Sequence, residues 1–210
     1  MAGIPQNFQS VSNVLPTYSF VDIASGTGYV TFYAGATVDL KLLSNFTYYS
    51  DTFVYSGNTN STTYVSLLDH DYDTVLNRPL VLYGKGIVNI PYAYKRGAAG
   101  TCVTYAKVTL RKYDGVTETD ICTNDSREVT YTSGTLQYDI LSVDLNIPLT
   151  TIKKGETLRL TIEVFAHSNN IADTAYAYYA SDPKGRTTGW DTTGAVPSVL
   201  TFQCPVRLNL

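Results

Sequence analysis

The chain has 210 residues, which is long enough to bury a sizeable core as one large all-β domain or as two small domains. Charged residues make up 16% of it and 18 residues are tyrosine, a composition that suits the pleated, half-buried surfaces of strands. The net charge of -3 argues against a nucleic-acid binder, and no apolar run reaches the ~18 residues that a membrane-spanning helix needs.

The first residues, "MAGIPQNFQSVSNV", have neither the basic start nor the apolar stretch of a secretory signal peptide, so we expect synthesis in a cytosol. Strand-like segments then recur along the first half of the chain, each bounded by turn residues. They are residues 18–23, residues 29–34 after a turn at Gly26-Thr27-Gly28, the alternating stretch 38–43, the aromatic stretch "FTYYSDTFVYSG", and two strands around a tight turn at Gly84-Lys85-Gly86.

The stretch 102–112 alternates between two faces, which predicts a half-buried strand. One face carries Cys102, Thr104, Ala106, Val108 and Leu110, and the other carries Val103, Tyr105, Lys107, Thr109 and Arg111. The Asp114-Gly115 pair that follows predicts a turn that sends the chain back.

Residues 141–147 and 158–164 alternate in the same way and flank the polar turn 153–156, with Arg159, Thr161 and Glu163 facing outward. This pattern predicts a β-hairpin with one wet face. In the last strand, "SVLTFQCPVRLNL", Pro205 lacks the N–H of a ladder bond, which predicts an edge or a bulge there.

A helical period is absent outside "SNNIADTAYAYYA", and no repeat or linker divides the chain. Short strands with turn signals about every 8 to 12 residues predict an all-β fold, a two-sheet antiparallel sandwich of jelly-roll-like type. We expect a single domain over residues 1–210, with a short extended N-terminal arm of about residues 1–15.

The three cysteines, Cys102, Cys122 and Cys204, are odd in number and have no metal-binding spacing. Free and mostly buried thiols are the expected state of a chain made in a cytosol. Because Cys102 and Cys122 flank a predicted hairpin, a disulfide between them in an oxidising medium is the alternative.

The stretch "LLDHDYD" is the first candidate site, and we interpret it as a polar loop between strands. Asp69, Asp71 and Asp73 recur at every second position and can wrap a hard cation, so a structural Ca²⁺ stays open beside a purely solvated loop. An EF-hand is excluded, because Thr74 and Leu80 stand where its glycine and glutamate belong. No other cofactor is expected.

A catalytic role for this stretch is the less favoured interpretation. His70 lies beside two aspartates and so can act as a general base, but the sequence has no nucleophile motif and only two histidines. His167 follows a predicted strand and is interpreted as a loop residue. We therefore expect a protein that is not an enzyme.

Aromatic side chains are the second candidate. Most tyrosines on strands pack half-buried, although an exposed row can stack on sugar rings or fill a protein interface. The tyrosines in question are Tyr48, Tyr49, Tyr92, Tyr94, Tyr176, Tyr178 and Tyr179. The irregular stretch 181–197 carries the single tryptophan, Trp190, beside Arg186 and Asp191, and a loop of that length often binds a partner.

Several short stretches resemble abundant small structural proteins of marine tailed phages: "KKGETLRLTIEVFA", "SDPKGR" and the ending "LTFQCPVRLNL". Ile4-Pro5 and residues 30–34 also match that group, whereas Val206 stands where the group usually has an aromatic residue. The resemblance implies a capsid decoration (cement) protein, a β-sandwich unit that is often trimeric and that binds the outside of an icosahedral shell. It implies no catalytic residue.

We therefore expect a virion structural protein, made in the host cytoplasm and placed on the capsid exterior. Its expected partners are the major capsid protein and further copies in a homotrimer, with no nucleic acid and no membrane. The residues expected at interfaces are Ile4, Pro5 and Phe8 of the arm, and Arg186, Trp190 and Asp191 of the loop. The alternatives are a carbohydrate- or receptor-binding module of a tail fibre and, last, an enzyme that uses Asp69, His70 and Asp71.

Overall fold

The computed structural model describes residues 27–36, 41–45, 47, 53–185 and 198–207, and this part of the chain is all-β, with twelve strands and no helix. None of its elements is therefore a helix that could cross a membrane. The strands are β1 (Thr27–Ala36), β2 (Lys41–Ser44), β3 (Phe53–Thr59), β4 (Val65–Val75), β5 (Leu80–Arg96), β6 (Cys102–Tyr113), β7 (Glu118–Asp125), β8 (Val129–Tyr131), β9 (Gln137–Ile152), β10 (Thr157–Ser168), β11 (Ala175–Ser181) and β12 (Leu200–Arg207).

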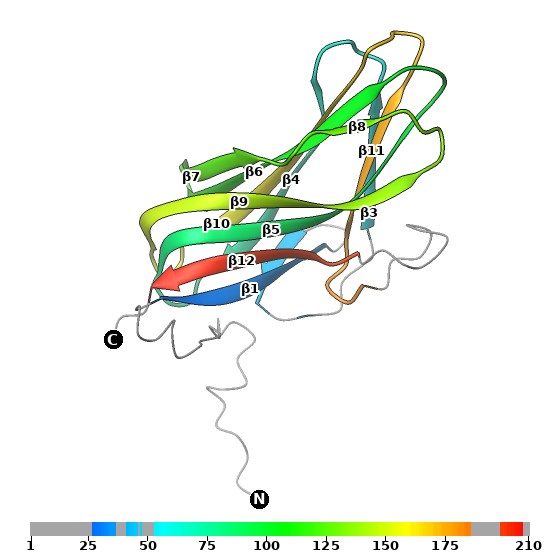
Figure 1. Ribbon diagram of the computed structural model, residues 1–210. Coiled ribbons are helices and arrows are strands. Elements are labelled where there is room, and N and C mark those ends of the chain that lie inside the picture. The colour runs from blue at the N-terminus through cyan, green and yellow to red at the C-terminus, as the bar shows by residue number, and fades with distance from the viewer. Residues whose placement is uncertain (1–26, 37–40, 46, 48–52, 186–197, 208–210) are drawn as a thin grey trace, which may run out of the picture.

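Hydrogen bonds connect these strands into one mixed sheet (Figure 1). Its order is β3-β11-β5-β12-β1-β2-β4-β10-β6-β7, while β9 pairs with β5 and β8 pairs with β6. The pairs are antiparallel except β2 with β4, which run parallel and meet at the single pair Leu42 and Asp73. In Figure 1 the run β9-β5-β12-β1 lies in front of the run β4-β10-β6.

Alternation of apolar residues positions the core. The even-numbered residues from Leu158 to Val164 on β10 are fully buried, and so are Leu141 and Leu145 on β9. Phe32 of β1 and Phe202 of β12 stack with their ring centroids 6.1 Å apart. These side chains belong to one continuous apolar cluster, so burial of one face of each strand is the main force that holds the sheet together.

The hairpin that was predicted for residues 141–164 is wrong, although both of its strands exist. β9 pairs with β5, whereas β10 lies between β4 and β6. The turn between them docks on the residue after β4: the N–H of Gly155 donates to Leu76 O at 2.8 Å, and the N–H of Leu76 donates to Glu156 O at 3.0 Å. The chain therefore crosses to another part of the sheet, and two amphipathic strands in sequence do not reveal which neighbours each will choose.

The predicted turn at Gly84-Lys85-Gly86 is also wrong, because β5 continues through it as a strand of 17 residues. The register with β9 shifts between Leu82 and Gly84, and Gly84 has a φ of 119°, where glycine is favoured. A Cβ on Gly86 would lie 2.9 Å from Phe202 Cε2. These glycines therefore serve a bulge and a close packing contact.

One predicted turn and one predicted bulge are confirmed. The Asp114-Gly115 turn joins β6 to the antiparallel β7, and Asp114 Oδ1 accepts from the N–H groups of Val116 at 2.9 Å and Thr117 at 2.7 Å. The register of β12 with β5 shifts between Gln203 and Val206, so Pro205 lies at a bulge. Pro205 is not on an edge strand, because β12 also pairs with β1.

Some predicted features lie outside the described residues: the strand 18–23, the arm with Ile4, Pro5 and Phe8, the loop with Arg186, Trp190 and Asp191, and Tyr48 and Tyr49. The described part of the stretch 38–43 begins β2, and Thr27 and Gly28 begin β1. The stretch "AYAYYA" forms β11 and is not helical. His167 is in β10 and is not a loop residue.

Candidate functional site: the outer face of β4, β10 and β6

The stretch "LLDHDYD" is not a loop but the middle of strand β4. Tyr72 is fully buried, while Asp69 is exposed and Asp71 and Asp73 are half-buried. Successive side chains of a strand point to opposite faces, so the three carboxylates share the outer face of the sheet. The alternation of charge that suggested a loop is instead the pattern of a strand with one wet face.

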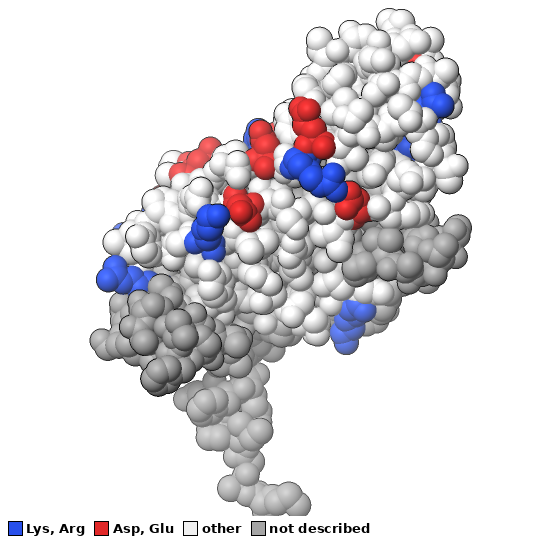
Figure 2. All heavy atoms as spheres, in the orientation of Figure 1, with Lys and Arg blue, Asp and Glu red and all other residues white. Residues whose placement is uncertain are grey.

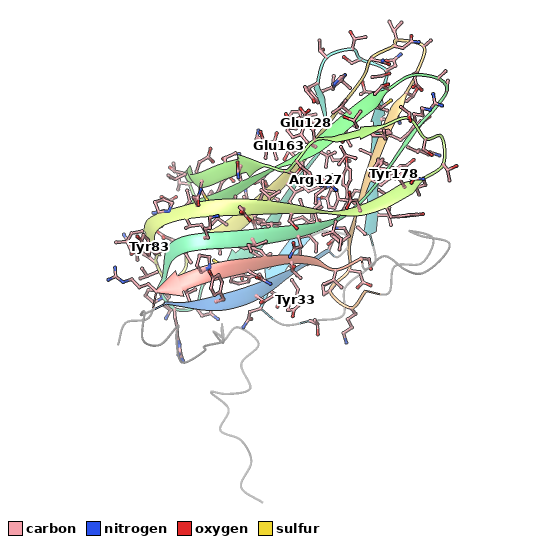
Figure 3. All side chains as sticks on the ribbon, in the orientation of Figure 1. Tyr33, Tyr83, Arg127, Glu128, Glu163 and Tyr178 are labelled. Atoms are coloured by element: carbon pink, nitrogen blue, oxygen red, sulfur yellow. The ribbon has the colours of Figure 1, made fainter. Side chains whose placement is uncertain are left out.

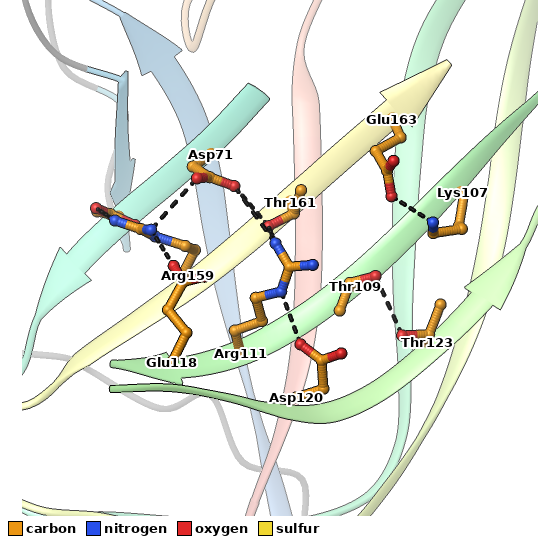
Figure 4. Close-up of polar contacts among 11 residues, drawn as sticks. Asp71, Lys107, Thr109, Arg111, Glu118, Asp120, Thr123, Arg159, Thr161 and Glu163 are labelled. Carbon is orange, nitrogen blue, oxygen red and sulfur yellow. Dashed lines mark hydrogen bonds and ion pairs between the residues drawn. The ribbon is translucent and has the colours of Figure 1, made fainter. Parts of the chain in front are cut away.

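Strand register aligns these carboxylates with polar groups of β10 and β6 in three rows. The rows are Asp73–Arg159–Arg111, Asp71–Thr161–Thr109 and Asp69–Glu163–Lys107. Figure 4 shows the contacts of Asp71 in the second row and the Glu163–Lys107 pair of the third. Direct cross-strand neighbours have Cβ atoms about 4.5–5.5 Å apart, so each row is a set of contacts.

Arg159 holds the first row together. Its Nε and Nη2 donate to the two carboxylate oxygens of Asp73 at 2.7 Å each, a bidentate pair. Nη1 pairs with Glu118 of β7 and lies 3.3 Å from Asp71 Oδ2. The guanidinium also lies over the ring of Tyr113, 5.3 Å from its centroid. The hydrogen bonds that Arg159 donates to Asp73 raise the pKa of its guanidinium, which therefore stays charged at any ordinary pH.

Arg111 links the second row to β7. Its Nε donates to Asp120 Oδ1 at 2.7 Å and its Nη1 donates to Thr161 Oγ1 at 2.8 Å. The hydroxyl of Thr161 donates onward to Asp71 Oδ1 at 2.6 Å. The two arginines therefore satisfy Asp71, Asp73, Glu118 and Asp120 through a connected network that spans four strands.

The third row has an excess of negative charge. Lys107 Nζ of β6 lies 2.5 Å from Glu163 Oε2 of β10. Asp69 of β4, the strand that flanks β10 on its other edge, is the register partner of Glu163. Burial first, and then the nearby carboxylates Glu163 and Asp71, raise the pKa of Asp69. On β7, Asp125 is the register partner of Lys107 and adds a further carboxylate to this row.

Below the third row the face becomes aromatic. Tyr105 of β6 and Phe165 of β10 are register partners whose rings stack with centroids 5.2 Å apart. Tyr64 packs edge-on against Tyr105 at 5.1 Å and against His167 at 4.5 Å. The hydroxyl of Tyr64 donates to Glu128 Oε1 at 2.5 Å.

The geometry of β4 does not fit the calcium clip considered for Asp69, Asp71 and Asp73. Residues of a strand are about 3.3 Å apart along its axis, so Asp69 and Asp73 lie roughly 13 Å apart, too far for one ion with ligands at about 2.4 Å. Asp71 and Asp73 are instead paired with arginines. In the described ranges, no group of three or more histidine, cysteine or acidic side chains is placed to hold a metal ion.

His70 lies on the opposite side of β4 and contacts tyrosines. Its Nδ1 shares a hydrogen bond with the Tyr179 hydroxyl, its ring lies 4.1 Å from that of Tyr55, and Tyr179 and Tyr72 share a hydrogen bond of 3.3 Å. Burial, and to a smaller extent Lys41, lowers the pKa of His70 to about 4, so the imidazole is neutral at pH 7. The pairing of His70 with Asp69 or Asp71 is thus not a catalytic dyad.

Cys102, Cys122 and Cys204 are free thiols, and the first two are far apart. Cys122 is the register partner of Leu110, eight residues along β6 from Cys102, which corresponds to roughly 26 Å at about 3.3 Å per residue. A disulfide requires Cα atoms within about 7 Å, so this pair cannot form one in this fold. Burial raises the pKa of the Cys122 thiol to about 11.

The sequence identified only part of this face. The outward positions of Lys107, Arg111, Arg159 and Glu163 follow from alternation, but their alignment with the aspartates depends on the order β4-β10-β6, which no local signal carries. The ring cluster of Tyr64, Tyr105 and Phe165 was missed, because aromatic residues that are remote in the sequence gave no pattern.

No protein-family model matches the chain, and no curated protein matches it either. Solved structures do share its fold. A CocE/NonD family hydrolase from Staphylococcus aureus superimposes over 86% of this chain with a TM-score of 0.52 and 11% identity. An aminopeptidase from a marine sediment archaeon, Thaumarchaeota archaeon, covers 87% with a TM-score of 0.54 and 8% identity. An α-amino acid ester hydrolase covers 85% with a TM-score of 0.52 and 12% identity.

The chain spans 37%, 37% and 36% of the lengths of these three proteins. At such low identity the likeness shows the fold alone. The expectation of a virion structural protein that is not an enzyme, together with the tail-fibre alternative, is corrected on this finding: the three structures that share the fold at TM-scores above 0.5 are hydrolases. Chains from infectious bursal disease virus superimpose at TM-scores of only 0.25 and 0.28, which carry no argument for a capsid role.

Proposed function

We propose that this chain is the all-β domain of a hydrolase. The observation that supports the proposal is the superposition of 85 to 87% of the chain on about a third of each of three hydrolases, with TM-scores of 0.52 to 0.54. In the described ranges, His70 and His167 contact tyrosine rings and are not hydrogen-bonded to a serine or cysteine nucleophile. The described residues therefore contain no Ser–His or Cys–His pair that would assign a nucleophile.

We further propose that the sheet folds over into a two-layer antiparallel sandwich of jelly-roll-like type. Three observations support this arrangement. The run β9-β5-β12-β1 lies over the run β4-β10-β6 in Figure 1, and buried side chains of both runs belong to one apolar cluster. Asn124 of β7 also donates from Nδ2 to Asp144 O of β9 at 2.8 Å, a contact between strands that are not paired in the sheet.

Esters and amides of α-amino acids are the first substrates to test. Two of the three hydrolases are named an aminopeptidase and an α-amino acid ester hydrolase. Both names specify a bond to an amino acid, so amino-acid p-nitrophenyl esters and aminoacyl p-nitroanilides form a matched pair of chromogenic probes.

The test is immunodepletion of a lysate from the source cells with an antibody raised against the 210-residue chain. We expect the hydrolysis of these probes to fall in the depleted lysate and to appear in the captured fraction. The purified chain is assayed in parallel, and an unrelated antibody serves as the control. The proposal is wrong if depletion leaves hydrolysis unchanged and neither the captured material nor the purified chain cleaves either probe.

A further inference from the structure

The third row and the aromatic residues next to it combine unbalanced negative charge with one exposed and two half-buried rings, and we call this area the acidic–aromatic patch. Its charged members are Asp69, Lys107, Asp125, Glu128 and Glu163, and its rings are Tyr64, Tyr105 and Phe165. The arginines of the first row, Arg111 and Arg159, form their ion pairs with carboxylates outside the patch. These are Asp71, Asp73, Glu118 and Asp120. Four carboxylates therefore share one lysine, which leaves this patch with a net charge of -3.

Three of the four carboxylates of the patch, Asp69, Asp125 and Glu128, form no ion pair within the described residues. The fourth, Glu163, pairs with Lys107. Asp69 and Glu163 are directly opposite each other, and like charges in that position are destabilising. A positive charge placed over Asp69 relieves this repulsion.

Two cationic side chains of the outer face are each bound by a carboxylate and an aromatic ring. The ammonium of Lys107 lies between the Glu163 carboxylate at 2.5 Å and the ring of Phe165, with 5.3 Å to the ring centroid. The guanidinium of Arg159 lies in the same way between Asp73 and the ring of Tyr113. A cation held by a carboxylate and an aromatic face gains both ionic and cation–π attraction. Tyr64, which is 40% exposed, and Tyr105 offer the same surfaces to an incoming cation.

We propose that the acidic–aromatic patch docks a lysine- or arginine-rich segment of a protein partner. Charge complementarity selects this occupant, because the patch is acidic and its rings favour cations. Asp69 and Asp125 are three strand positions apart, about 14 Å at roughly 4.8 Å per strand, which an extended segment covers in about four residues. Two basic residues four positions apart reach both carboxylates. This role is independent of hydrolysis by the protein.

The contrasting surface is the outer face of β9, β5, β12 and β1. The side of the molecule seen in Figure 2 carries Lys and Arg side chains next to Asp and Glu side chains, and Figure 3, in the same orientation, labels Tyr33 and Tyr83. In Figure 3 Glu128 and Glu163 are labelled beside β8, β6 and β10. On β9, Asp144 is 54% exposed and lies 3.5 Å from Lys85. It provides a carboxylate of equal charge outside the patch.

The test is fluorescence anisotropy of labelled decalysine with the 210-residue chain at salt concentrations from 20 to 200 mM. We expect saturable binding that weakens as salt rises, and no binding of decaglutamate. Asp69→Asn should weaken decalysine binding about two- to fivefold, and Asp69→Asn with Asp125→Asn should weaken it further. Tyr105→Leu, which removes a ring but keeps an apolar side chain, should also weaken it about two- to fivefold.

The control is Asp144→Asn, which removes the same charge and should leave the affinity unchanged. Melting temperatures of all variants check that they fold. Equal weakening by Asp144→Asn and Asp69→Asn would mean attraction to net charge alone and would overturn the proposal. Absence of binding at 20 mM salt would overturn it as well. A salt-sensitive dimer in sedimentation that Asp69→Asn abolishes would assign the patch to a second copy of this chain and contradict a basic partner.

Discussion

At the scale of single residues, His70 shows how its surroundings, and not the neighbours in its sequence, set its chemistry. Two aspartates flank it in the chain, yet its ring contacts Tyr55 and Tyr179 on the opposite side of β4. Burial, followed by the charge of Lys41, lowers its pKa to about 4, while Asp71 acts weakly in the other direction. The protonated imidazole is therefore destabilised in the folded protein.

The first prediction concerns pH. The pKa of His70 is about 4 in the folded state and about 6.5 when the chain is unfolded, so the unfolded state binds more protons between these values. The contribution of His70 to stability is present above pH 6.5 and is lost as the pH falls toward 4. We expect the melting temperature to drop from pH 7 to pH 4.5, and to drop less in His70→Gln. An equal fall in both proteins would contradict this account.

The second prediction concerns Arg159, whose side chain is 20% exposed and holds Asp73 with two hydrogen bonds. Arg159→Met keeps the apolar stem but leaves Asp73 and Glu118 without this cation. We expect a loss of about 1–2 kcal/mol in the free energy of unfolding, measured by urea denaturation. Lys85→Met is the control, because Lys85 is 67% exposed and makes one ion pair of 3.5 Å, and it should change stability by less than about 0.5 kcal/mol.

At the scale of elements, β4 and β5 show that polar and glycine-rich stretches can be continuous strand. The alternation of aspartates in β4 is a strand pattern, because every second position faces the arginines of neighbouring strands. The two glycines of β5 mark a bulge and a tight contact with Phe202, not a turn. Local composition alone predicted a loop in the aspartate-rich part of β4 and a turn at the glycines of β5.

The third prediction follows from the extended geometry of β4. Since Asp69, Asp71 and Asp73 spread along a strand, they cannot converge on one calcium ion. We expect the same melting temperature in millimolar Ca²⁺ and in excess chelator, measured by differential scanning fluorimetry. A rise of several degrees with Ca²⁺ that disappears in Asp71→Asn would show that the carboxylates do bind the ion.

The fourth prediction concerns Gly86 of β5. An added Cβ would lie 2.9 Å from Phe202 Cε2 and 3.2 Å from Gln203 O, and the backbone oxygen cannot move aside easily. Gly86→Ala should therefore lower the free energy of unfolding by about 1–3 kcal/mol through overpacking. Gly134→Ala is the matched control, since the nearest atom to its Cβ would be Arg96 O at 3.9 Å. Equal stability of the two variants would refute the close contact.

At the scale of the whole molecule, the sequence predicted which face of a strand is buried better than it predicted which strands pair with each other. The alternation of residues 102–112 and 158–164 correctly gave β6 and β10 and the side of each that is buried. It did not predict that β10 lies between β4 and β6, because pairing depends on residues far apart in the chain. The candidate site was found only in part for the same reason: Asp71 and Asp73 were singled out, but their partner Arg159 was not.

The pairing of β1 with β12 has a consequence for the route by which the chain folds. Thr27 is the register partner of Arg207, and between these two strands lies nearly all of the described chain. Contacts of such high sequence separation require a costly loop closure before they stabilise anything, and proteins rich in them fold slowly, in milliseconds to seconds. During synthesis β1 waits for β12 to leave the ribosome. Until then, the edges of β1 and β5 that β12 will occupy stay open to other strands, which makes this the stage at which a nascent chain is most exposed to aggregation.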